Sequence, residues 1–341
     1  MGIGISLSGL ASSVATAGGI GTIAAVGVGL IHGTPDKSFR QNNVEGVIRE
    51  IRRARKMTKG ILAINIMAVL TNFGELVETA ISEKIDIIFS GAGLPLDLPK
   101  YKPPDSITKL IPIVSSARAA RIIANKWVQN YNYAPDAFVV EGPDAGGHLG
   151  FSFNDLDSKK FRLEDLVKEV VPIAEALSLT HQKAIPVIAG GGITTGKQIH
   201  EILKLGASAV QLGSSFIVTH ECDASDEFKQ AIVNSDCKSI RLIKSPVGLP
   251  GRAIENDFLL AAERGEKKPR GCRYNCLKSC NPKTIQYCIA DALLSAYKGE
   301  FGSGFAFSGA KAYALNNITS VQEVFNRISG EYNAYREPVK A

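Results

Sequence analysis

The sequence has little excess charge and no concentrated basic stretch. Its 39 Lys and Arg against 33 Asp and Glu leave a net charge of +6 over 341 residues. Nucleic-acid-binding surfaces gather Lys and Arg in a stripe, often with aromatic side chains among them. The basic runs at 56–60 and 263–270 are short and are expected to be solvated. These features exclude a nucleic-acid partner, and the mild positive charge serves at most to attract an acidic partner or a phosphorylated ligand.

Charge is missing altogether from residues 2–31, which contain no Asp, Glu, Lys or Arg. A membrane span or a secretory signal would share this property. However, no basic residues precede the stretch, Gly and Ser interrupt it, and its hydrophobicity comes largely from Ala. We therefore predict a small-residue helix over 8–17, then a buried strand, in a cytoplasmic protein that spans no membrane.

The motifs of the common nucleotide-binding folds are missing as well, since there is no GxxxxGK[ST] and no GxGxxG after a first strand. Short apolar runs alternate instead with amphipathic stretches, a pattern typical of a parallel sheet covered on both sides. The predicted strands are Ile20–Val26, Ile61–Met67, Ile85–Phe89, Ile111–Val114, Ala137–Glu141, Ile185–Ala189 and Ala209–Leu212. The predicted helices between them are Val44–Lys56, Gly74–Glu83, Ala117–Gln129, Leu163–Leu179 and Lys197–Leu205.

Glycine-rich turns follow nearly every predicted strand, and this favours a (β/α)8 TIM barrel over a doubly wound sheet. The βα loops of a barrel all gather on one face, whereas a doubly wound sheet carries its glycine fingerprint after the first strand. A barrel needs one more strand before the helix at 8–17, so we expect the first strand to be truncated. The predicted divisions are the barrel at 1–234, an insertion or lid with a cysteine cluster at 235–310, and a closing helix with a tail at 311–341.

Two glycine turns adjoin at the last two strands, AGGGI at 189–193 and QLGSSF at 211–216. Backbone N–H groups in such turns bind phosphate, and barrels often have a phosphate site at this place. Glycines also form tight turns where no ligand binds. Two such turns side by side, with hydroxyls at Ser214 and Ser215, favour the phosphate site.

A third turn, EGPDAGGHLG at 141–150, places two glycines before a histidine, also after a predicted strand. Gly146 and Gly147 permit close backbone approach to a ligand, and His148 follows where its side chain can reach a substrate. An imidazole with a pKa near about 6.5 suits proton removal from a carbon acid. The other histidines accompany no motif and are expected to be structural: His32, His181, His200 and His220.

Taken in order from Met1 to about residue 254, these motifs resemble the nitronate monooxygenase (2-nitropropane dioxygenase) family. The flavin-dependent enoyl-acyl-carrier-protein reductase is its near relative. The resemblance is carried by NIM (65–67), SGAGLP (90–95), EGPDAGGHLG (141–150), AGGGI (189–193), QLGSSF (211–216) and SPVGLPGRA (245–253).

The resemblance implies a barrel that binds FMN non-covalently and acts on a small-molecule substrate with O2 or NAD(P)H, and it is compatible with a homodimer. It implies that His148 is the catalytic residue and that Asn65 and Glu141 lie near the flavin ring. The FMN-binding residues that follow from it are Met1, Asn65, Glu141, Gly146, Gly147, Gly191, Gly192, Gly213 and Ser214, and the phosphate falls to the last four.

Four of the six cysteines fall in one segment beyond these motifs: Cys272, Cys276, Cys280 and Cys288. Their spacing departs from the CxxC knuckles of zinc sites, and i, i+4 spacing also fits one packed face of a helix. The four cysteines could bind zinc or an iron–sulfur cluster, but with no histidine close by the packed helix face is favoured, and no metal ligand is assigned.

Three functions remain open. The preferred one, because of PDAGGHLGF, is an FMN-dependent monooxygenase that converts alkyl nitronates and O2 to a carbonyl compound and nitrite. The second is an NAD(P)H-dependent enoyl-acyl-carrier-protein reductase, which would need a basic patch for the acidic carrier protein. The third is a flavin-binding module without turnover. The candidates for the basic patch are Arg252, Arg264, Lys267, Lys268 and Arg270.

Overall fold

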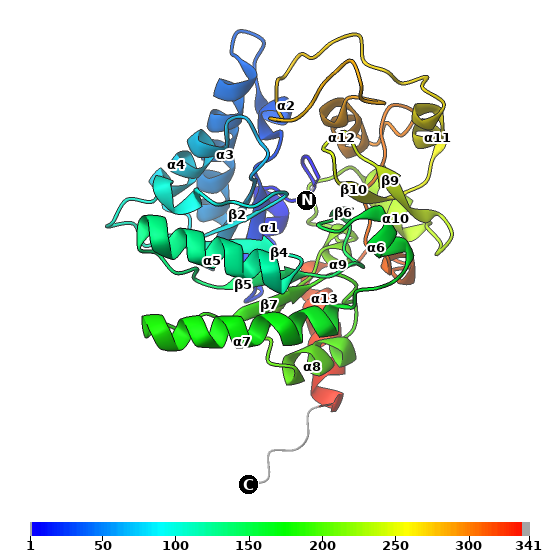
Figure 1. Ribbon diagram of the computed structural model, residues 1–341. Coiled ribbons are helices and arrows are strands. Elements are labelled where there is room, and N and C mark those ends of the chain that lie inside the picture. The colour runs from blue at the N-terminus through cyan, green and yellow to red at the C-terminus, as the bar shows by residue number, and fades with distance from the viewer. Residues whose placement is uncertain (1, 336–341) are drawn as a thin grey trace.

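The computed structural model describes residues 2–335 (Figure 1). Its main feature is a curled, TIM-barrel-like sheet of parallel strands in the order β1-β2-β3-β4-β5-β7-β8. The bounds are β1 Gly21–Ala24, β2 Leu62–Met67, β3 Ile87–Gly91, β4 Lys109–Val114, β5 Phe138–Glu141, β7 Val187–Gly190 and β8 Ala209–Gln211. All seven predicted strands are confirmed. The described residues contain no eighth strand in this sheet and no pairing of β8 with β1.

Helices follow the strands as the periodicity predicted, and two of them begin with capping boxes. Ser38 and Gln41 cap the start of α3, and Thr195 and Gln198 cap the start of α8. The helices of the sheet are α1 Ser8–Thr16, α2 Val28–His32, α3 Phe39–Met57, α4 Phe73–Ser82, α5 Ala117–Tyr131, α7 Leu163–His181 and α8 Gly196–Lys204. The C-terminal helix α13, Val321–Tyr335, packs against α8, as Figure 1 shows near the C-terminus.

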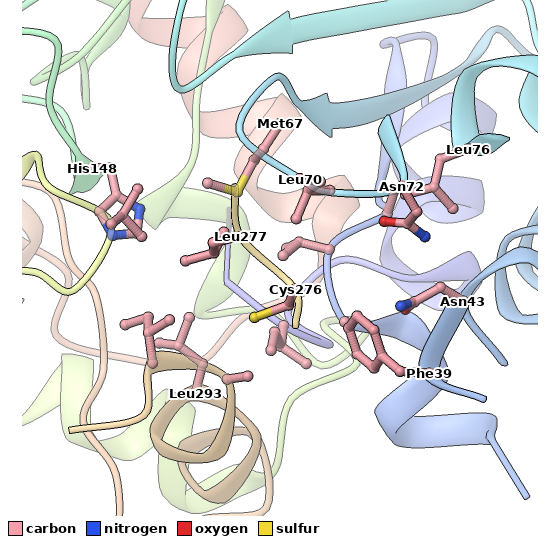
Figure 2. A pocket seen from close by; sticks show the side chains of 17 residues that line it. Phe39, Asn43, Met67, Leu70, Asn72, Leu76, His148, Cys276, Leu277 and Leu293 are labelled. Atoms are coloured by element: carbon pink, nitrogen blue, oxygen red, sulfur yellow. The ribbon is translucent and has the colours of Figure 1, made fainter. Parts of the chain in front are cut away.

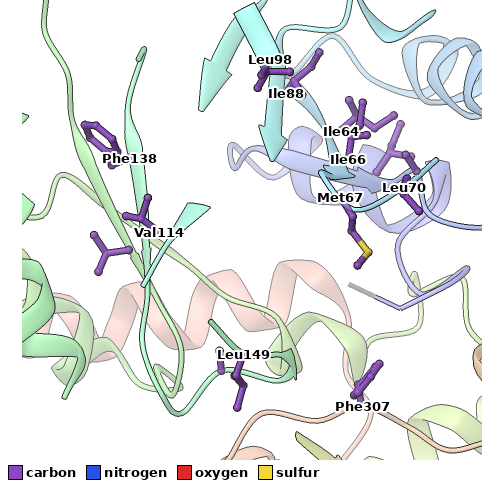
Figure 3. Packing of buried hydrophobic residues seen from close by; sticks show 14 of the residues in the cluster. Ile64, Ile66, Met67, Leu70, Ile88, Leu98, Val114, Phe138, Leu149 and Phe307 are labelled. Carbon is purple, nitrogen blue, oxygen red and sulfur yellow. The ribbon is translucent and has the colours of Figure 1, made fainter. Parts of the chain in front are cut away.

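Alternation along the strands separates the two faces of the sheet. One face forms an inner cluster of Ala63, Ile87, Phe89, Ile111, Ala137, Val139 and Ile188. The other face packs against the helices in a larger hydrophobic cluster. Figure 3 shows part of this cluster, with the strand residues Ile64, Ile66 and Ile88 grouped together and Val114 near Phe138. Because the interior is filled, a ligand finds room only at the carboxyl ends of the strands.

A small antiparallel sheet, in the order β6-β10-β9, lies beside the main one. Strand β6 is Gly147–His148 from the 141–150 loop, while β9 (Ile240–Lys244) and β10 (Pro250–Ile254) come from the segment 235–310. The remaining elements around it are α6 Phe153–Asp157, α9 Ser214–Ile217, α10 Asp226–Val233, α11 Asp257–Glu263 and α12 Ile289–Tyr297. The segment 235–310 thus pairs directly with the loop that carries the candidate catalytic histidine.

Candidate active site

Polar side chains stand at the carboxyl ends of the strands, on the inner face. Asn65 follows Ala63 by two residues and Glu141 follows Val139 by two, so both side chains share the inward direction of the inner cluster. Gln211 points the same way. Glu141 pairs with Gly190 and Gly190 pairs with Gln211 in the strand register, and paired residues of neighbouring strands share a face of the sheet. Sequence reasoning missed Gln211, although its place at the end of a strand was a usable signal.

Burial changes the acid–base behaviour of one of these groups, because it raises the pKa of Glu141 to about 7. A carboxyl that stays protonated up to this pH in the folded protein ionises near its ordinary value once unfolded. The free energy of unfolding therefore falls as the pH rises from about 4.5 to about 7. Above about pH 7 the buried carboxyl is ionised in the folded protein, and the destabilisation is complete.

We expect Glu141→Gln to raise the melting temperature of flavin-free protein at about pH 8 and to leave it nearly unchanged at about pH 4. The amide has the shape of the acid but never ionises. Thermal unfolding followed by circular dichroism at the two pH values checks this, with the exposed Glu78→Gln as control. An equal gain at both pH values would contradict the assignment.

The turn after β7 passes tightly against the 141–145 loop. Gly191 has φ +107° and Gly192 has φ +74°. A Cβ atom at Gly191 would lie 3.0 Å from the Gly142 carbonyl oxygen and 3.1 Å from the Ala145 nitrogen. Only glycine fits both the backbone angle and the space, so this turn is built for close approach of backbone groups.

The turn after β8 meets a third segment that sequence reasoning missed, residues 308–311. The Gly309 N–H donates to Ser214 Oγ at 3.3 Å, and the Ala310 N–H donates to the Asp144 carbonyl at 3.0 Å. Ser215 is 1% exposed, and its Oγ has no hydrogen-bond partner among the described residues. The predicted phosphate-binding turns are thus brought together, with one buried hydroxyl still free to donate.

Two charged groups border these turns. Lys311 Nζ lies 3.3 Å from Asp144 Oδ2, so the carboxylate nearest to Gly192 is paired with a cation. We call the two turns after β7 and β8, with Gly191, Gly192, Gly213 and Ser214, the phosphate cradle. The pairing with Lys311 reduces the repulsion that Asp144 would exert on an anion bound there.

The two glycines before His148 have different surroundings. A Cβ atom at Gly146 would lie 2.6 Å from the Ser308 carbonyl carbon, so the close approach here is to the 308–311 segment. Gly147 has φ +76° and open space where a Cβ would stand. The required conformation at Gly147, together with the tight contact at Gly146, sets the direction of the chain into His148.

His148 is held by residues far away in the sequence. Gly251 of β10 pairs with it, and its Nε2 lies 2.6 Å from Ser245 Oγ. Its ring meets Phe307 edge-on at a centroid distance of 4.9 Å. Burial lowers the pKa of His148 to about 3, so the imidazole is neutral at neutral pH. The unshifted pKa assumed from the sequence is therefore wrong for the ligand-free site.

His148 lines one end of an apolar pocket, and Met67 separates it from the far end at Phe39, Asn43 and Asn72 (Figure 2). The apolar walls come from the mouth of the sheet and from the segment 235–310, among them Ile3, Leu70, Val247, Leu277, Ile289 and Leu293. The glycines of the phosphate cradle do not line this pocket. The loop 141–148 joins the two places, because Ala145 contacts Gly191 and His148 faces the pocket.

The four clustered cysteines surround a second, smaller cavity, which we call the cysteine hollow. They are free thiols. Within residues 2–335 no three His, Cys, Asp or Glu side chains converge as ligands of a single metal ion. The hollow is lined by Cys272, Cys276, Cys280 and Cys288 together with Pro269, Gly271, Tyr274, Pro282, Ile285 and Ile289.

The sequence profile of the nitronate monooxygenase family matches residues 1–331. The chain belongs to the nitronate monooxygenase family. A "Probable nitronate monooxygenase" of Staphylococcus saprophyticus is 26% identical over 231 residues, 66% of this chain and 59% of that protein. The chain thus spans about three fifths of the length of this curated relative.

Solved structures of this fold are similar over nearly the whole chain. FabK of Thermotoga maritima is 25% identical with a TM-score of 0.73, covering 98% of this chain and 91% of its own. A nitroalkane oxidase of Streptomyces ansochromogenes has a TM-score of 0.72 at 21% identity, and the match covers 98% of this chain and 94% of the oxidase. At this identity the similarity establishes the fold of this chain and nothing about its activity. The family is named for an enzymatic activity, which is evidence against the third candidate, a flavin-binding module without turnover.

The residues present fit a flavin phosphate. At Gly213 a Cβ would meet nothing within 4 Å, so the turn after β8 borders open space, and the buried, unpartnered hydroxyl of Ser215 lies next in sequence to Ser214. Met1, which the resemblance implies as an FMN-binding residue, lies outside the described residues. No helix among the described residues is long and apolar enough to cross a membrane.

Proposed function

We propose that this protein is an FMN-dependent nitronate monooxygenase that converts alkyl nitronates and O2 to a carbonyl compound and nitrite. The observation that carries the proposal is His148, a neutral imidazole fixed by Ser245 and Phe307 at the end of an apolar pocket. Gly191, Gly192, Gly213 and Ser214 would hold the phosphate, with Asn65 and Glu141 facing the ring. FMN, when bound, supplies the two-electron redox chemistry and the reaction with O2.

His148 in its neutral form can accept a proton from the carbon next to the nitro group of a neutral nitroalkane. The C–H electron pair stays on the substrate as the nitronate, and the proton moves to the imidazole. Burial disfavours an isolated imidazolium, but the nitronate formed beside it is an anion that compensates its charge. The apolar walls exclude water, which strengthens this pairing.

The test is nitrite release from propyl nitronate in air by the flavin-loaded protein, compared with anaerobic bleaching of the flavin by NADPH. We expect nitrite release in step with oxygen consumption and no bleaching. Rapid bleaching by NADPH without nitronate turnover would favour the second candidate instead.

That second candidate is an enoyl-acyl-carrier-protein reductase, favoured by the likeness to FabK. The predicted basic patch needs correction, because Arg252 does not take part. Its guanidinium is partly buried and donates to the carbonyls of Pro143 and Ala145 at 2.8 and 3.2 Å. Arg264 pairs with Glu266. The patch is left with Lys267, Lys268 and Arg270, which supports this candidate less well.

A further inference from the structure

A long irregular segment, residues 264–288, connects α11 to α12 and forms part of the pocket wall. Figure 1 shows it as a yellow-to-orange loop that reaches over toward α2. The Thr71 N–H donates to the Cys276 carbonyl at 3.1 Å, and the Lys278 N–H donates to the Val69 carbonyl at 3.0 Å. Loops longer than about 12–15 residues without secondary structure are uncommon in compact domains and usually functional or disordered. This one is fastened at its middle to the mouth of the sheet.

The inside of this segment is the cysteine hollow, and its chemistry is unusually uniform. Four cysteines line it, no histidine or carboxylate does so, and the other lining side chains are apolar apart from Tyr274. Cys272 lies at the exposed end, and the other three thiols are partly buried. None of the four forms a disulfide. A cavity lined in this way offers sulfur ligands and nothing else.

A backbone N–H group points at one of these sulfurs. The Asn275 N–H donates to Cys272 Sγ at 3.2 Å. Cys288 is the N-cap of the nine-residue helix α12, and its side chain accepts no capping hydrogen bond there. Hydrogen bonds of the kind that Cys272 accepts stabilise thiolates and are one of the means by which proteins tune iron–sulfur clusters.

We propose that the four cysteines of the hollow bind an iron–sulfur cluster. A single zinc ion would require all four sulfurs within about 2.3 Å of one point. Among the described residues the four cysteines line one cavity and do not converge as ligands of a single ion, which favours a cluster over a zinc ion. Binding releases the thiol protons and leaves four thiolate ligands.

The cluster would lie next to the substrate pocket and would hold one of its walls in place. Cys276 lines both the hollow and the pocket that contains His148, and Leu277 next to it pairs with Leu70 of the opposite wall. A cluster that fixes the segment 264–288 would therefore fix the pocket wall. This role does not depend on the proposed function, since it concerns metal content and the order of one loop.

The first experiment is anaerobic purification of the whole chain, followed by assays of iron, acid-labile sulfide and zinc and by electron paramagnetic resonance after reduction with dithionite. We expect about two to four iron atoms per chain, matching sulfide, and a cluster signal. Stoichiometric zinc without sulfide overturns the proposal. The protein is also incubated anaerobically with ferrous iron and sulfide. If it then retains no more iron than the background amount, the proposal is overturned as well.

The second experiment compares Cys280→Ser with Cys237→Ser, an exposed free thiol outside the hollow. The first variant should lose most of its iron and sulfide, and the second should keep the wild-type amount. Equal losses in the two variants would show adventitious iron.

A third measurement needs no variant and stays informative where Cys280→Ser folds poorly. Cys237 and Cys272 are both exposed. In the cluster-loaded wild type, an alkylating reagent should label Cys237 and spare Cys272. Equal labelling of both contradicts the proposal.

Discussion

Replacing Gly191 with Asp is expected to abolish flavin binding. A side chain here meets backbone atoms of Gly142 and Ala145 at 3.0–3.2 Å, and φ +107° strains any residue other than glycine. The carboxylate would also bring a negative charge to the turn that is proposed to bind the phosphate. Two unit charges about 4 Å apart repel by about 4 kcal/mol at an effective dielectric constant of 20, about a thousandfold in affinity. The measurement is flavin released on heat denaturation, with fluorescence titration of the flavin-free variant.

Two further variants separate charge from backbone strain. At Gly213 a Cβ atom would meet nothing within 4 Å, so Gly213→Asp brings the same charge to the cradle without a clash. We expect a folded protein that has lost most of its flavin affinity. Gly302→Asp adds a carboxylate in equally open space, on an exposed turn, and should bind flavin normally. Normal flavin content in both cradle variants would place the phosphate elsewhere.

The strands and helices of the main sheet could be predicted because each is a local pattern. Near-continuous apolar runs such as the one ending at Met67 form strands buried on both faces, and stripes at helical spacing form the helices between them. The small sheet could not be predicted in the same way. Its strand β6 has only two residues, and its pairing joins His148 to Gly251, about a hundred positions later.

In the candidate site, too, the residues that belong to local motifs could be predicted, and those that only the fold brings in could not. The glycine turns and His148 stand out in the sequence, since their residue types are rare in that combination. Their partners do not, because Ser245 and Phe307 reach the histidine only through the fold. The pKa of His148 depends on burial, which no motif encodes. Arg252 was misjudged for the same reason, because a surface charge and a buried loop anchor look alike in a sequence.

His148→Ala is expected to slow turnover of neutral nitroalkanes by about 10²–10⁴, the usual scale of general acid–base catalysis. Without the imidazole no described side chain at this end of the pocket can accept the proton, since the other lining groups are apolar or amides apart from the Cys276 thiol, whose pKa burial raises to about 12. The loss with preformed nitronate should be much smaller, because that substrate arrives deprotonated. Steady-state oxygen consumption with nitroethane and with ethyl nitronate, each as kcat and kcat/KM, checks this difference.

The control is His200→Ala, which removes a histidine that contacts Tyr332 away from the pocket and should leave both rates unchanged. In an enoyl reductase the His148 variant would instead be impaired in NAD(P)H-driven flavin reduction or product protonation, and nitronates would be poor substrates of the wild type. Small and equal losses on every substrate would mean that the imidazole only fixes its own loop, through Ser245 on one side and Phe307 on the other. The split between the two substrates is therefore what identifies His148 as the base, because a residue that only orders the pocket would slow nitroalkane and nitronate alike.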